Sequence, residues 1–150
     1  MLGITSKDAH IMNKINIARL VVGGLVAGVI MNAVSLLSAG LYLSEMMELL
    51  DSRGIQPPGG TLPMVVYLLM RFVWGFVAVW FYVAARPRFG PGPKTAVLIG
   101  FVFWLGGVFL GVVSYGMMGM FPMGMLTQWA AITLVGILAS TVVGAWIYRE

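Results

Sequence analysis

The sequence predicts an all-α membrane protein, an antiparallel bundle of four transmembrane helices. The 150 residues are 60% hydrophobic and 9% charged, with a mean hydropathy of +0.97. A soluble domain of this size needs polar side chains to cover its surface, and about a quarter of its residues are usually charged. Four stretches of the chain also reach the roughly 18 apolar residues that a helix needs to cross about 30 Å of hydrocarbon. These observations exclude an ordinary water-soluble fold.

The four helices are predicted over residues 20–43, 63–85, 95–116 and 126–148 of a single domain that spans residues 1–150. The first is about twice as long as the apolar core of a signal peptide, and its small-residue cluster Ser38-Ala39-Gly40 is followed by more apolar chain, so we expect the helix to be retained. Residues 44–50 are predicted as a short amphipathic piece at the interface, ahead of a loop rich in Pro and Gly. Residues 86–94 alternate Pro and Gly with three cations, which predicts a rigid turn.

Lysine and arginine residues predict the orientation, because short loops rich in them stay in the cytoplasm. Seven of them lie near the two termini or between the second and third helices, namely Lys7, Lys14, Arg19, Arg86, Arg88, Lys94 and Arg149. Arg53 alone lies in a loop on the other side. We therefore expect a multi-pass protein with both termini in the cytoplasm. These short segments also account for the formal net charge of +4, so we expect no nucleic-acid binding.

Two segments of the sequence are distinctive. The Trp-rich second helix is followed by Ala85-Arg86-Pro87-Arg88-Phe89-Gly90-Pro91-Gly92-Pro93-Lys94-Thr95-Ala96, and the chain closes with Gly144-Ala145-Trp146-Ile147-Tyr148-Arg149-Glu150. In these segments the chain resembles a group of small uncharacterised bacterial four-helix integral membrane proteins. The resemblance spans most of the chain and implies a location in the bacterial inner (cytoplasmic) membrane. It implies no activity, and the Met-rich loop after the third helix is not part of it.

Each predicted helix carries small residues on one face when it is projected at about 100° per residue. A spacing of four residues between small side chains allows two helices to approach closely in lipid. The residues with this spacing are Gly24 and Gly28, Gly107 and Gly111, and Gly136, Ser140 and Gly144. These faces either pack inside one bundle, which we favour, or dock another subunit.

Arg71 is the strongest candidate for a binding residue, because it lies about two turns inside the membrane boundary, where a charge is costly unless it is paired or hydrated. One interpretation is that it binds an anionic substrate or headgroup, or a carboxylate of Glu45 or Glu48. The other, which we favour, is that its long side chain reaches the interface and bonds Ser35 or Ser38 at a similar depth.

Asn32 lies near the middle of the first predicted helix. A buried amide at this depth usually bonds a neighbouring helix, which contributes about 1 kcal/mol. We favour this packing role for Asn32 over a place in a polar pathway.

The loop after the third helix contains five methionines, Met117, Met118, Met120, Met123 and Met125. Thioethers are soft ligands that suit Cu(I), so a weak metal site is one interpretation. An adaptable apolar contact surface is the other, and we favour it because the Gly and Pro residues of this loop make it short and tightly turned. The chain has no Cys, and its single His, His10, is expected to be solvated or interfacial on the opposite side.

The sequence predicts no enzyme activity and no cofactor. No residues combine into a nucleophile, a base and an orienting group, and no phosphate-binding Gly motif follows a strand. We expect a non-catalytic accessory or scaffold subunit that packs in the lipid bilayer against another membrane protein or a second copy of itself. The alternative is a small binder or transporter, with a polar site at Arg71 and Asn32 or a Cu(I) site in the Met-rich loop.

The orientation gives the first testable prediction. Reactive probes placed at Gly92 should report the cytoplasm, and probes at Gly60 or Gly119 should report the outside, because a short cationic loop is poorly translocated. Labelling of intact cells with an impermeant reagent measures this. If Gly92 is labelled from outside, the orientation is reversed.

Overall fold

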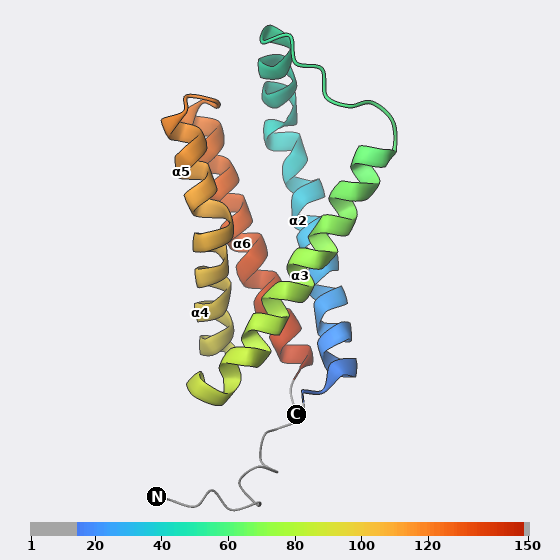
Figure 1. Ribbon diagram of the computed structural model, residues 1–150, viewed down its shortest axis with the longest axis vertical. Coiled ribbons are helices and arrows are strands. Elements are labelled where there is room, and N and C mark those ends of the chain that lie inside the picture. The colour runs from blue at the N-terminus through green and yellow to red at the C-terminus, as the bar shows by residue number, and fades with distance from the viewer. Residues whose placement is uncertain (1–14, 149–150) are drawn as a thin grey trace, which may run out of the picture.

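The computed structural model describes residues 15–148, which form α2 (Ile17–Ser52), α3 (Leu62–Phe89), α4 (Pro93–Trp104), the π-helical segment η1 (Leu105–Phe109), α5 (Leu110–Met117) and α6 (Met123–Ile147). Because α4, η1 and α5 continue one another over Pro93–Met117, the described chain has four helices that are long and apolar enough to span a membrane. The predicted all-α four-helix membrane fold is therefore confirmed (Figure 1). Lys7, His10, Lys14 and Arg149 lie outside the described residues.

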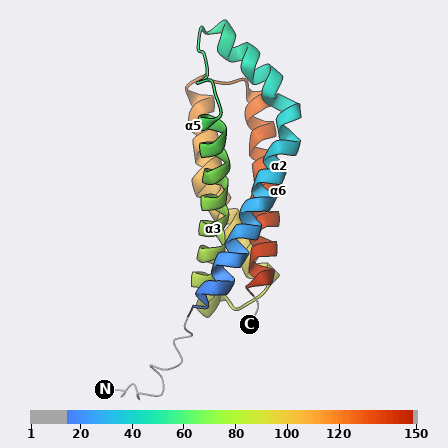
Figure 2. The same ribbon diagram turned by 90° about the vertical axis from the view of Figure 1, so that its right-hand side faces the viewer.

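The helix α2 is longer than predicted. It continues without a break to Ser52, so residues 44–50, predicted as a short amphipathic piece at the interface, are a continuation of the first membrane helix. The Leu, Met and Glu residues of this stretch are good helix formers, and the first residue with a positive φ is Gly54, at 67°. At about 1.5 Å per residue its 36 residues span about 54 Å, well beyond a bilayer core. Figure 2 shows this end of α2 reaching past the other helices.

The helix α3 also runs further than predicted, to Phe89, and includes Pro87 in its last turn. Gly90, with a φ of 80°, ends it, because few other residues adopt this conformation. The hydroxyl of Thr95 then donates to the carbonyl oxygens of Phe89 at 3.2 Å and Gly90 at 2.8 Å. These bonds satisfy two carbonyl oxygens at the end of α3. The connection from α3 to α4 consists of three residues, 90–92.

Glycine residues allow the helices α2, α3 and α6 to pack closely against one another. A Cβ atom added to Gly75 of α3 would overlap the backbone of Gly28 on α2 and lie 2.8 Å from the carbonyl carbon of Ala27. A Cβ atom on Gly23 of α2 would lie 2.8 Å from the carbonyl oxygen of Gly144 on α6. Helices in lipid are held together by such close packing rather than by the hydrophobic effect. We refer to these residues as the three-helix contact.

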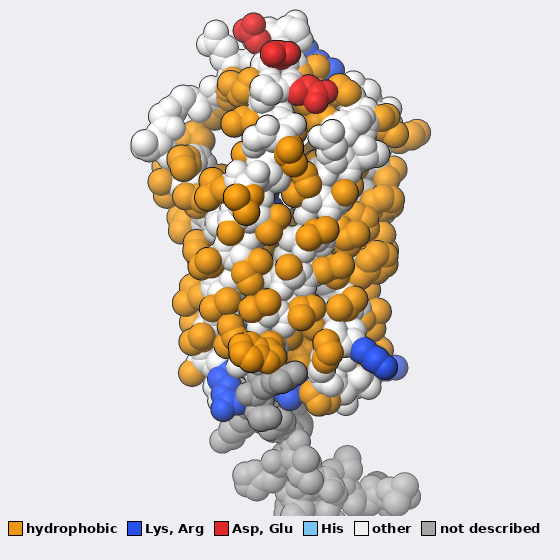
Figure 3. All heavy atoms as spheres, turned by 180° about the vertical axis from the view of Figure 1, so that it is seen from behind, with side chains coloured by type: hydrophobic (Ala, Val, Ile, Leu, Met, Phe, Trp, Pro, Cys, Tyr) orange, Lys and Arg blue, Asp and Glu red, His pale blue; other side chains and the backbone are white. Residues whose placement is uncertain are grey.

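The two ends of the bundle differ in charge. The carboxylates of the described chain, Glu45, Glu48 and Asp51, all lie on the protruding end of α2, here named the acidic end. Figure 3 shows these carboxylates at one end of the molecule with a basic side chain beside them, further Lys and Arg at the other end, and a hydrophobic band between the two ends. We name the opposite end, where α3 joins α4, the basic end.

The helix α3 diverges from the Pro93–Met117 rod toward the acidic end. Within the described residues, the backbone of α3 approaches α4 but does not come within 8 Å of α5. Figure 1 shows α3 crossing the bundle diagonally and separating from α5 and α6. This divergence leaves a space between α3, α5 and α6 in that half of the molecule.

The three-helix contact gives a prediction about stability. Gly75→Ala should lower the free energy of unfolding by about 2 kcal/mol, because its methyl group forces two backbones apart. Gly40→Ala is the matched control, since no neighbouring atom lies within 4 Å of a Cβ at Gly40. Thermal unfolding in mild detergent measures both variants. Equal melting temperatures for the two would show that the contact does not determine stability.

Candidate functional site

A cavity of about 550 Å³ occupies the space between α3, α5 and α6. Its walls are mostly apolar and aromatic, and none of its lining residues within 15–148 is acidic. The polar groups include the Arg71 guanidinium and the hydroxyls of Tyr67 on α3, Tyr115 on α5 and Thr133 on α6. Apolar clefts of this size with a few polar groups are typical of small-molecule binding sites.

Arg71 lies on the wall of this cavity, nine residues into α3, or roughly 14 Å along the helix axis. Its Nη2 donates a hydrogen bond to the hydroxyl oxygen of Tyr67, one turn nearer the acidic end. The guanidinium carbon also lies 4.6 Å from the centre of the Tyr67 ring, a cation–π contact that partly offsets the cost of the charge.

The hydrogen-bond partner of Arg71 is not one of the residues that the sequence suggested, namely Glu45, Glu48, Ser35 and Ser38. Glu45 and Glu48 do not line the cavity. Ser35 and Ser38 border a narrow gap of about 20 Å³ beside Arg71, but the Ser38 hydroxyl donates to the Ser35 carbonyl oxygen at 3.1 Å. A serine in a helix readily bonds its own backbone in this way. Tyr67, which the sequence analysis did not propose as a partner, is therefore the residue that positions Arg71.

Aromatic side chains form much of the cavity wall. The rings of Tyr115 on α5 and Trp129 on α6 are stacked, with centroids 6.3 Å apart. The Trp74 ring on α3 contacts Phe103 on α4 at 5.0 Å. The indole nitrogen of Trp104 donates to the Ala130 carbonyl oxygen at 3.1 Å, which ties the Pro93–Met117 rod to α6. The cavity is therefore bounded by large, well-packed rings.

The π-helical segment η1 forms one side of the cavity. Its Gly107 lies against the Trp74 indole, and a Cβ atom there would lie 2.7 Å from a ring carbon. A π-helical turn adds one residue to the rod and is frequent at functional sites. The adjacent glycines Gly106 and Gly107 were the sequence signal for this irregularity, which the prediction of a regular third helix missed.

Asn32 is buried in the interface between α2 and α3, away from the cavity. Its Nδ2 donates to the Gly28 carbonyl oxygen at 3.0 Å and to the Leu68 carbonyl oxygen at 3.4 Å. The second bond joins two helices, which is the kind of contact expected of a buried amide. Asn32 and Arg71, which the alternative interpretation of the sequence grouped as one polar site, line no common cavity among those of the described residues.

The small residues proposed for helix packing fall into two groups. Gly24 and Gly28 lie against Phe76 and Phe72, Gly136 lies against Val34, Gly144 belongs to the three-helix contact, and Ser140 is fully buried. Gly107 instead meets a single indole ring, and no atom lies within 4 Å of a Cβ at Gly111. Gly111 lines the cavity because α5 stands apart from α3.

The Met-rich hairpin lies at the acidic end between α5 and α6. Four of its methionines are exposed to different degrees, namely Met117 (85%), Met118 (73%), Met123 (69%) and Met120 (40%). Met125 is buried, at 3%, in the first turn of α6. The guanidinium of Arg53 donates to the Met120 carbonyl oxygen at 2.5 Å, which joins the two loops of this end.

Comparison of the chain with models of protein families, with curated proteins and with solved structures finds no match.

Proposed function

We propose that this small integral membrane protein is a non-catalytic binder of an amphiphile with an anionic group. The site is the cavity between α3, α5 and α6, with Arg71 as the anion-binding residue and the aromatic walls as the surface for the apolar part. The observation that carries the proposal is a guanidinium on the wall of an apolar cavity whose described lining contains no carboxylate.

The anionic group follows from the chemistry of Arg71. A guanidinium stays charged and has five N–H donors, of which the structure uses one for a side-chain hydrogen bond to Tyr67. A charge inside a membrane is stabilised by a counter-charge or by water. A carboxylate or phosphate in the cavity would supply the counter-charge and accept two parallel hydrogen bonds.

The apolar part of the ligand follows from the shape of the cavity. Since α3 and α5 do not pack against each other, the space between them faces the region of the lipid chains. Trp74, Tyr115 and Trp129 offer flat apolar surfaces to an alkyl chain or ring system. An amphiphile that enters from the bilayer would match both the charge of Arg71 and the apolar walls of the cavity.

We also propose a location for the protein and its orientation in the membrane. We propose a bacterial inner membrane as the location, on the resemblance of the loop and the C-terminal segment. We propose that the basic end faces the cytoplasm, because the positive-inside rule applies to its short loop. The Arg71 cavity would then open in the outer half of the membrane.

An accessory or scaffold role is a second candidate function, and the exposed hairpin methionines favour it. Met117, Met118 and Met123 carry apolar side chains at the acidic end, where they are more than two-thirds exposed. Unbranched thioethers adapt to the surface of a partner, either another membrane protein or a second copy. A Cu(I) site in the same loop is the less favoured alternative, because Met125 is buried while the other methionines of the loop are exposed.

Binding of a dibrominated fatty acid tests the Arg71 cavity. Bromine quenches tryptophan fluorescence on contact, and Trp74 and Trp129 line the cavity. Saturable quenching is expected for the purified protein in neutral detergent. Arg71→Gln should weaken binding about tenfold or more, the effect of losing a charge-assisted hydrogen bond. A brominated alkyl maltoside should be insensitive to this substitution.

Two matched controls accompany this experiment. Arg53→Gln removes a cation at the same end but outside the cavity lining, so binding should be unchanged. Gly107→Ala should displace the Trp74 indole and weaken binding, while Gly106→Ala should not, since a Cβ at Gly106 has no neighbour within 4 Å. If Arg71→Gln and Arg53→Gln bind the fatty acid equally well, the anion site at Arg71 is ruled out.

Replacement of Met117, Met118, Met120, Met123 and Met125 by Leu tests the second candidate. The fold should persist, because Leu and Met have similar volumes, and the proteins that co-purify should change. Met125→Leu alone is the control, since this side chain is buried and unavailable to a partner. Mass analysis of the purified material measures partners and metal together. Stoichiometric Cu(I) in the parent that is lost from the fivefold variant would favour the metal site instead.

A further inference from the structure

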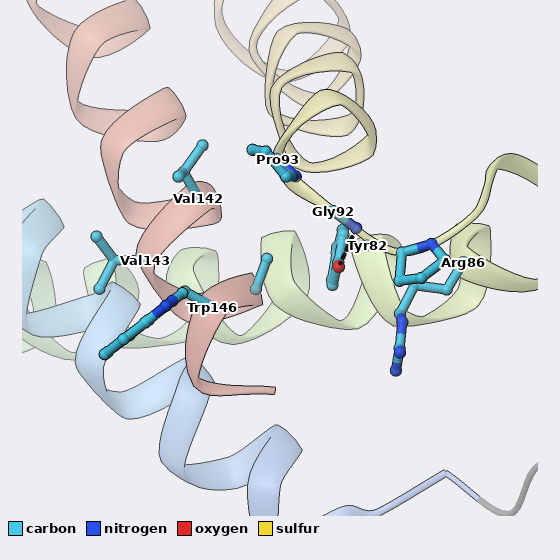
Figure 4. Close-up of a pocket in the computed structure, with 9 residues that line it drawn as sticks. Tyr82, Arg86, Gly92, Pro93, Val142, Val143 and Trp146 are labelled. Carbon is cyan, nitrogen blue, oxygen red and sulfur yellow. Dashed lines mark hydrogen bonds between the residues drawn. The ribbon is translucent and has the colours of Figure 1, made fainter. Parts of the chain in front are cut away.

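A second cavity, of about 520 Å³, lies at the basic end between the end of α3, the start of α4 and the end of α6 (Figure 4). Val142 and Trp146 of α6 lie on one side, and Tyr82 and Arg86 of α3 lie on the other. The Tyr82 hydroxyl accepts a hydrogen bond from the Gly92 N–H at 3.1 Å, which holds the loop in place. The cavity therefore has an apolar wall facing a polar one.

Arg86 lines this cavity, and its guanidinium is held by the surrounding protein. Its Nε is buried and has no hydrogen-bond partner among the described residues. The guanidinium carbon lies 5.2 Å from the centre of the Tyr148 ring, so the group is held against an aromatic face rather than extended into solvent. Buried donors in folded proteins nearly always have an acceptor. An anion in the cavity would meet the Nη groups of Arg86, which lines it.

The charge around the cavity favours an anion. Arg88 and Lys94 flank the same loop and are exposed, and the carboxylates of the described chain are all at the opposite end. Trp146 is 61% exposed at the end of α6, a position typical of tryptophan at a membrane interface. An apolar wall, an arginine and an interfacial tryptophan thus meet at the depth of lipid headgroups.

We propose that this cavity binds an anionic phospholipid of the adjoining leaflet. The phosphate accepts hydrogen bonds from the Arg86 guanidinium, which matches phosphate geometry, and the acyl chain lies along Val142 and Trp146. Basic pockets between transmembrane helices bind lipid headgroups in this way. The site is separate from the Arg71 cavity, so its existence does not depend on the function proposed above.

Native mass spectrometry of the full-length protein with defined lipids tests the proposal. The purified protein is mixed with phosphatidylglycerol or with phosphatidylcholine of the same acyl chains. One phosphatidylglycerol should be retained per chain, and phosphatidylcholine about tenfold more weakly. Arg86→Gln should weaken phosphatidylglycerol binding about tenfold. Arg88→Gln is the matched control and should weaken binding much less than Arg86→Gln, because Arg88 adds to the charge around the cavity but does not line it.

A second variant keeps the test decisive if Arg86→Gln does not fold. Val143→Phe fills the cavity from α6 without changing the charge, and it should also reduce phosphatidylglycerol retention. Three results would overturn the proposal. These are equal losses for Arg86→Gln and Arg88→Gln, equal retention of the two lipids, or displacement of the lipid by glycerol phosphate at the same concentration, which would indicate a site for soluble phosphates.

Discussion

The close approach of α2, α3 and α6 at the three-helix contact is the constraint on which the rest of the structure depends. Gly23, Gly28, Gly75 and Gly144 leave no space for a side chain, so the backbones are fixed against one another at these points. In lipid, where apolar side chains gain little by leaving the solvent, this packing carries much of the association energy. The helix crossing at this contact also sets the angle at which α3 leaves the bundle.

The Arg71 cavity results from the angle at which α3 leaves the bundle. Beyond the contact, α3 carries large side chains such as Trp74 in place of glycine, and it separates from α5. The π-helical turn at Leu105–Phe109 adjusts the opposite wall, where Gly107 admits the Trp74 ring. Close packing at the three-helix contact therefore supports the half of the bundle that contains the Arg71 cavity, which is a suitable arrangement for a binding site.

The two cavities share one chemical principle. Each combines an apolar wall with one arginine, Arg71 in one half of the membrane and Arg86 at the basic end. Each guanidinium also lies over a tyrosine ring, Tyr67 or Tyr148, which orients it without neutralising its charge. Such sites fit amphiphiles with an anionic group, and the distance between the cavities implies two separate ligands rather than one path.

The sequence by itself determined the helical membrane fold, because composition and the length of apolar stretches decide whether a chain is stable in lipid. The sequence also identified Arg71 as a candidate binding residue, because a charged residue within an apolar stretch can be recognised from the order of the residues alone. The Tyr67–Arg71 hydrogen bond is local, since the two residues lie four apart on one helix. The tertiary structure was needed to show that Leu68 is the interhelical partner of Asn32 and that Gly111 lines a cavity. The partner of Asn32 and the place of Gly111 depend on how α3 crosses the bundle, which results from contacts between residues such as Gly28 and Gly75 that are far apart in the chain.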